Sequence, residues 1–262
     1  MQSATKENQI FTHETEVELS DAVKKLMEDV RANPENASLY VQLGISLRGQ
    51  MLMIEAIEAY SEGLTHAPFY VPLYRHRGHA YVNVRRYREA AADFELALRL
   101  EPDNWDCWYH LALSYFLMEN YERAAETYAN CMKVSHTPER KIAPTDWFYM
   151  TLNILGRSSE GESLLQEIGE GLEAGDSAGY YDRVLAYKGV LSPEEVIKKA
   201  ETLDDHMFAT YCYGIARLYL FRGEKEKAKN LMERIFERGT LWSGFAEQAA
   251  ERDPVSYTHL RA

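Results

Sequence analysis

The stretch YRHRGHAYVNVRRYREAAADFELALRLEP, residues 74–102, decides the fold, because the segments before and after it repeat its pattern at a step of 34 residues. Large residues recur where helices must fill space, and small residues recur where helices must cross closely. The three matching sets are Tyr40, Leu43, Gly44, Leu47, Ala56, Tyr60, Gly63 and Pro68; then Tyr74, Arg77, Gly78, Tyr81, Ala90, Phe94, Ala97 and Pro102; then Trp108, Leu111, Ala112, Tyr115, Ala124, Tyr128 and Cys131. Self-similarity at this period indicates an array of paired helices.

The small and proline residues explain how such pairs would pack. Gly44, Gly78 and Ala112 fall where the first helix of each pair touches the second. Pro68 and Pro102 end the second helix and force a turn into the next pair, since proline removes a backbone donor and restricts the residue before it. The residues therefore predict a stack of helix pairs without strands.

This pattern resembles the tetratricopeptide repeat, whose signature is an aromatic residue, Leu-Gly, Tyr, then Ala, an aromatic residue, Ala and Pro. The resemblance implies an all-α fold, a right-handed superhelical α-solenoid of antiparallel helix pairs with a concave binding face. The expected segments are a disordered N-terminus at 1–16, a capping helix at 17–36, three regular repeats at 37–138, degenerate helical repeats at 139–208, a C-terminal repeat at 209–242, and a partial helix with a non-native tail at 243–262.

The end of the chain, PVSYTHLRA at residues 254–262, starts no recognisable element. It resembles translated sequencing adapter, in which case the natural protein continues differently after Asp253. The alternative is an ordinary disordered terminus.

Composition bears on partners and location. The net charge is -12, whereas binding to nucleic acid needs a basic surface, so nucleic acid is not an expected partner. The three cysteines have no metal spacing and fit a reducing compartment. Neither a signal peptide nor a membrane-spanning run is visible, and we expect a cytoplasmic protein that does not enter a membrane.

The candidate binding site lies on the first helices of the repeats, at positions that helical spacing turns away from the second helix. The selected residues are Arg48, Arg75, His79, Asn83, Arg86, Tyr109, Leu113, Phe116 and Asn120. One helix stripe is expected to carry Arg75, His79, Val82 and Arg86, because they are spaced four, three and four residues apart. Because arginine binds carboxylates in a bidentate manner, we expect a ligand with acidic side chains or a free C-terminus.

One other interpretation of the two arginines stays open, whereas a chaperone clamp, a metal site and an active site are not expected. Arg75 and Arg86 could instead be solvated, or paired with acidic residues of the next repeat. The resemblance would allow a clamp for chaperone C-termini, but Val41 and Ile45 stand where that clamp needs Lys and Asn. His76 and His79 have no nearby ligand to complete a metal site, and no cofactor is expected. Catalytic motifs such as GxSxG, HExxH and a Walker loop are absent from the sequence, so we do not expect an enzyme.

The expected function is therefore that of an adaptor or scaffold that binds a peptide or a partner helix. An alternative is a regulatory domain that senses a peptide and changes shape. The layout of regular repeats, an irregular middle and a returning repeat also resembles the bacterial NlpI family, as do YKGVLSPEEV and YGIARLYLFRGEKEKAKNLME near residues 187–233. That resemblance implies a dimeric adaptor for a protease or hydrolase, although no lipoprotein signal is visible here.

Overall fold

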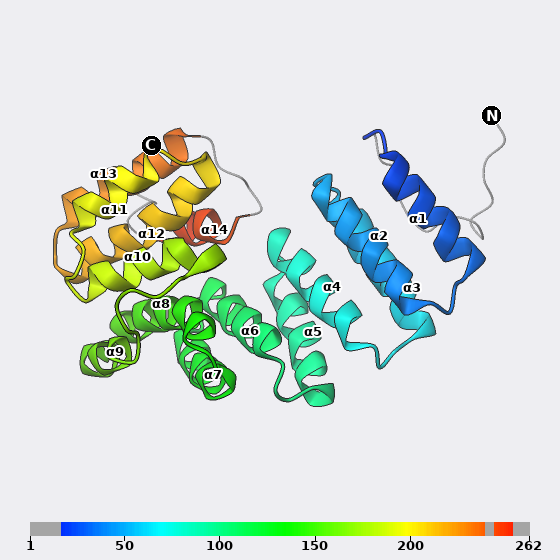
Figure 1. Cartoon of the computed structure of the whole chain (residues 1–262), viewed down its shortest axis with the longest axis horizontal. Helices are drawn as coiled ribbons and strands as arrows, with labels where there is room; N and C mark the ends of the chain where they lie inside the picture. Colours follow the sequence, from blue (N-terminus) through cyan, green and yellow to red (C-terminus); the bar gives the residue numbers. More distant parts are fainter. Residues whose placement is uncertain (1–16, 239–243, 254–262) are drawn as a thin grey trace. The chain divides into compact units, whose positions relative to one another are not determined.

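A computed structural model describes residues 17–238 and 244–253, and every long regular element in that part of the chain is an α-helix (Figure 1). The helices divide into two compact units, residues 1–110 (unit 1) and residues 111–262 (unit 2). The expected all-α fold of helix pairs is confirmed. The expectations for residues 1–16 and 254–262 lie outside the described residues, as does the end of the C-terminal repeat.

Unit 1 consists of helices joined by short turns. Its helices are α1 (Asp21–Ala32), α2 (Ala37–Gly49), α3 (Met53–His66), α4 (Val71–Asn83), α5 (Tyr87–Leu100) and the first part of α6 (Trp105–Leu117). Helix α2 packs along α3, and α4 packs along α5. Each of these pairs is one repeat, and its first and second helices are called helix A and helix B below (Figure 1).

Glycine permits the close crossing of helices A and B. A Cβ atom at Gly44 would overlap the ring of Tyr60, and one at Gly78 would lie 2.9 Å from the ring of Phe94. Both rings are completely buried. The small residues of helix A therefore receive aromatic rings of helix B, which confirms the predicted phase of the repeat.

The turn from helix A to helix B uses the left-handed backbone region at one fixed repeat position. Met51 and Arg85 have φ angles of 63°, and Glu119 has a φ angle of 61°. These residues are 34 positions apart in the sequence. The later turns place glycine in the same conformation, at Gly156, Gly189 and Gly223.

Unit 2 continues with shorter and less regular helices. Its elements after α6 are α7 (Tyr121–Val134), α8 (Pro138–Ile154), α9 (Ser158–Leu165), the 3-10 turn η2 (Gly175–Ser177), α10 (Ala178–Tyr187), α11 (Pro193–Ala200), α12 (Asp205–Phe221), α13 (Lys225–Glu237) and α14 (Phe245–Arg252). Helix α12 packs along α13 as helices A and B of a last repeat. The degenerate segment 139–208 contains α8 to α11.

The core of unit 2 contains a fully buried ion pair. The Nη2 atom of Arg183 on α10 lies 2.7 Å from a carboxylate oxygen of Asp146 on α8, and neither side chain has any exposed surface. Arg183 also donates to the carbonyl oxygen of Thr210 on α12, over 2.8 Å. Its Nε lies so close to Gly214 of α12 that a Cβ atom there would overlap it. The guanidinium thus joins α8, α10 and α12, and glycine makes room for it.

Two further findings concern the described residues. Between residues 17 and 238, and again between 244 and 253, no helix has the length and apolar character needed to cross a bilayer. Within the same ranges, no three histidine, cysteine or acidic side chains group so that they could bind a metal ion.

Candidate functional site

The structure brings together four of the predicted site residues on the A helices of unit 1. Arg48 lies in the last turn of α2, whereas Arg75, His79 and Asn83 follow one another at four-residue steps along α4. That spacing aligns the three α4 side chains along one face of the helix. We call Val41, Ile45, Arg48, Arg75, His79 and Asn83 the A-helix face of unit 1.

Arg48 connects the two A helices through neutral partners. Its Nη2 donates to Nδ1 of His79 over 2.6 Å and to Oδ1 of Asn83 over 3.3 Å. Because an arginine is always protonated and only donates, His79 must accept through an unprotonated Nδ1. Burial, with the nearby His110, Arg48 and Arg75, lowers the pKa of His79 well below its ordinary value, which keeps the ring neutral.

Arg75 is neutralised by a carboxylate of the following repeat. Its Nε and Nη2 donate to the two oxygens of Asp106 on α6, over 2.5 and 2.9 Å. Burial favours a raised pKa for Asp106, but His110 and Arg75 outweigh burial and hold that pKa well below its usual range. The alternative interpretation of Arg75, a pair with an acid of the next repeat, therefore describes its contacts.

Arg86 and Asn120 lie at the starts of B helices instead of on helix A. Arg86 is the N-cap residue of α5, and it donates to Glu89 over 2.8 Å. Asn120 is the N-cap residue of α7, and its side chain accepts from the backbone of Arg123. The predicted stripe extended to Arg86, but α4 ends at Asn83 and the chain turns at Arg85, which has a left-handed backbone.

Tyr109, Leu113 and Phe116 were predicted to line the groove, but the structure buries them, leaving 6%, 0% and 4% of their surfaces exposed. Tyr109 stacks on Trp105 at a ring distance of 5.6 Å, and Phe116 meets Trp147 edge-on at 5.0 Å. Helical spacing assigns a residue to a face but does not say what covers that face.

Two residues that the sequence analysis did not select lie at this site, Tyr60 beside Arg48 and His110 beside His79. Tyr60 of α3 carries a buried hydroxyl that has no hydrogen-bond partner among the described residues, and burial raises its pKa to about 12. His110 lies 4.8 Å from the ring of His79. His110 is 34 residues after His76, so the repeat step could have indicated it. Burial, followed by Arg75 and Arg48, lowers the pKa of His76 to about 4.

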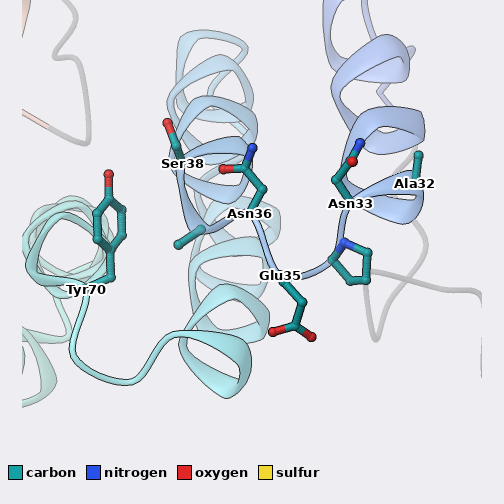
Figure 2. Close-up of a pocket in the computed structure, with 8 residues that line it drawn as sticks. Ala32, Asn33, Glu35, Asn36, Ser38 and Tyr70 are labelled. Carbon is teal, nitrogen blue, oxygen red and sulfur yellow. The ribbon is translucent and has the colours of Figure 1, made fainter.

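A hollow of unit 1 lies where α1 turns into α2. It has a volume of about 740 Å³ and is lined by residues 32–38 and Tyr70. Figure 2 shows the Tyr70 ring on one side and Asn33 on the other, with Ser38 and Asn36 between them. Its one acidic group, Glu35, lies 3.1 Å from His66. No convergent set of charged groups faces this pocket, so we do not place the site there.

Comparison with known proteins identifies the repeats. Models of the tetratricopeptide repeat match residues 76–130 and 209–238. Tetratricopeptide repeat protein 12 of Mus musculus is 28% identical over 80 residues, a match that covers 30% of this chain. The chain spans only 11% of the length of that protein.

Solved structures with the same fold cover more of the chain. A tetratricopeptide repeat protein from Parabacteroides merdae is 18% identical with a TM-score of 0.58, over 87% of this chain and 89% of that one. YrrB, described as a TPR protein with an unusual peptide-binding site, is 19% identical with a TM-score of 0.50, over 87% and 100%. MamA is 19% identical with a TM-score of 0.51, over 65% and 86%. At these identities the likeness shows the fold, and with the matched models it shows that the chain contains tetratricopeptide repeats within an α-solenoid fold.

Proposed function

We propose that this protein is a non-catalytic adaptor that binds a peptide or a partner helix on the A-helix face of unit 1. Its tetratricopeptide repeats and its structural neighbours support a role in protein interaction. The finer proposal is that the ligand presents a carboxylate, from an acidic side chain or a free C-terminus, to Arg48.

The observation that carries this proposal is the positive charge of Arg48. Among the described residues, its side-chain hydrogen bonds go to His79 and Asn83, which are neutral, whereas Asp106 neutralises Arg75. Burial lowers the pKa of Arg48, which means that its charge is partly desolvated without a matching anion. A ligand carboxylate would supply that anion, and charge-assisted bonds of this kind are among the strongest in proteins.

The surroundings of Arg48 suit a peptide. Ile45 lies one turn before it on α2, and 45% of its surface is exposed. Val41, one further turn away, is half-buried. A ligand residue next to the carboxylate could therefore bury an apolar side chain against Ile45 while the carboxylate binds Arg48.

The test compares peptides with a free C-terminus, the same peptides as amides, and peptides with internal acids on an array. We expect the wild-type protein to select carboxylate-bearing peptides and Arg48→Gln to bind them about 10–100-fold more weakly, the loss typical of one charged hydrogen bond. Arg99→Gln is the matched control, since Arg99 is an exposed arginine of α5. Equal binding by Arg48→Gln and the control would contradict the proposal.

The alternative of a peptide sensor stays a prediction, and the burial of helix α14 in unit 2 favours it. The dimeric adaptor for a protease or hydrolase, the homodimer and the cytoplasmic location also stay predictions. The proposal does not include nucleic acid as a partner, because a net charge of -12 opposes the binding of phosphates.

A further inference from the structure

Helix α14 is short, yet the structure buries most of it. Five residues in the run from Ala246 to Ala250 are buried in this eight-residue helix. It packs mainly on α12, the A helix of the last repeat. A short helix on an open surface would expose about half of its side chains, so the burial of five consecutive residues indicates that α14 lies in a groove.

The repeat register identifies that groove. The match of Gly44 with Ala216 places Tyr213 and Arg217 at the positions of Val41 and Ile45, and the 34-residue steps place Phe116 at the position of Arg48. Phe116 and Tyr213 line one small cavity together with Ala249, Arg252 and Asp253 of the α14 segment. The segment therefore covers, in unit 2, the positions that form the A-helix face in unit 1.

Ion pairs fasten α14 at both ends. Asp253 accepts from Arg217 of α12 over 2.5 Å, and Glu247 pairs with His206 of α12 over 2.9 Å. Arg252 donates to Glu119 over 2.9 Å.

Small side chains let α14 come close to the groove wall. Ala246 and Ala249 are 4% exposed, and Ala250 is completely buried. The groove thus accommodates a helix with two carboxylates six residues apart and alanine-sized residues between them.

We propose that α14 is an internal occupant of a second ligand groove on α12, and that a partner helix with the same pattern of carboxylates and small residues displaces it. This groove is distinct from the A-helix face of unit 1. Since α14 belongs to the same chain, its effective concentration is on the order of millimolar, and an outside helix must compete against it. Binding of a partner is thereby coupled to the release of α14, a change of shape of the kind that a sensor needs.

The experiment measures binding of a fluorescein-labelled peptide, GFAEQAAERD, which is residues 244–253, to the full chain by fluorescence anisotropy. The displaced variant is Ala249→Lys with Ala250→Lys, which puts two charges into the buried side of α14. We expect this variant to bind the peptide at least tenfold more tightly than the wild-type protein does, because its own α14 no longer competes. A peptide with Lys in place of Glu247 and Asp253 should not bind.

The control variant, Glu226→Lys with Asn230→Lys, adds two lysines to exposed positions of α13 and should bind like the wild type. A milder variant, Asp253→Asn with Arg252→Gln, weakens the attachment of α14 and leaves Arg217 and His206 in place. It should show a smaller gain in peptide affinity.

Two results would overturn the proposal. One is that both α14 variants keep their helicity but bind the peptide no better than the wild type. The other is a loss of helicity well beyond α14 in both variants, which would make α14 a part of the core instead of an occupant. The Arg48→Gln array test concerns a different site, in unit 1. Its outcome therefore tests the proposed function and does not decide whether α14 occupies a groove.

Discussion

Met51, Arg85 and Glu119 adopt a backbone conformation that is unfavourable for residues with a Cβ atom. In each case the residue makes the turn between helices A and B. The later turns use Gly156, Gly189 and Gly223 in the same conformation, which avoids the steric conflict between Cβ and the carbonyl oxygen. The regular repeats therefore carry a small local strain that the later ones do not.

Replacing Met51 by glycine should relieve this strain. Met51 is exposed, so little buried surface is lost. We expect Met51→Gly to raise the free energy of unfolding by about 0.5–1 kcal/mol, the relief of a left-handed residue less the extra entropy of an unfolded glycine. Chemical denaturation measures this change. Met51→Ala keeps the Cβ atom and should show no gain, and equal stability of the two variants would argue against strain at this turn.

The residues of the candidate site were only partly predictable. The helical step identified Arg48, Arg75, His79 and Asn83, which the structure brings together. It could not reveal that Asp106 neutralises Arg75, since that depends on the distance between neighbouring A helices. For the same reason, a reversal of charge at Arg75 would set two carboxylates against each other, and Arg48 is the better position for a binding test.

Among the elements, helix α11 begins with a cap made by neighbouring residues, whereas the position of helix α14 depends on distant ones. Ser192 caps α11 and accepts from the backbone of Glu195, while the side chain of Glu195 returns the bond. Because these contacts join residues three positions apart, they can be inferred from the sequence alone. A partial helix was expected after residue 243, but its position depends on Arg217 and His206, which are far away in the sequence.

The attachment of α14 should weaken as the pH rises. The hydrogen bond with Glu247 raises the pKa of His206 above its ordinary value of 6.5. The protonated ring therefore stabilises the docked helix fully below that ordinary value, and this contribution disappears as the pH passes the raised pKa. Above it, the fully buried Glu247 faces a neutral ring.

Hydrogen–deuterium exchange can follow this effect. Protection factors of the α14 amides, which correct for the intrinsic rate, should fall between pH 6 and pH 8 by less than about tenfold, because His206 is about half exposed. In His206→Gln, the same amides should be less protected at pH 6 and should change little with pH. An unchanged pH dependence in that variant would exclude His206 as the cause.

At the scale of the molecule, the chain consists of two compact units whose cores are of different kinds. In the core of unit 1, aromatic rings of B helices pack directly against glycines of A helices, as Tyr60 does against Gly44. In the core of unit 2, helices α8, α10 and α12 pack around the buried guanidinium of Arg183. The periodic pattern predicted the first kind of core, but nothing in the period indicates that Arg183 and Asp146 meet.

Gly214→Ala should damage unit 2 and leave unit 1 nearly intact. The new methyl group would overlap Arg183 Nε, and we expect a loss of about 2–4 kcal/mol from overpacking and a disturbed ion pair. Exchange measurements on the whole chain should show faster exchange in α8, α10 and α12 and little change in α2 to α5, since repeats depend chiefly on their neighbours. Gly169→Ala, where a Cβ atom meets nothing within 4 Å, is the control. Equal loss of protection in α2 to α5 would contradict this expectation.

The buried guanidinium also limits how this protein can be rearranged by engineering. The pairs α2–α3 and α4–α5 both pack a glycine of helix A against an aromatic ring of helix B, so duplicating one pair would leave no fully buried ion without its partner. By contrast, any recombination that separates α8, α10 and α12 would strand Arg183 or Asp146 in an apolar interior. Chimeras should therefore tolerate crossovers inside residues 37–100 far better than crossovers between residues 146 and 214.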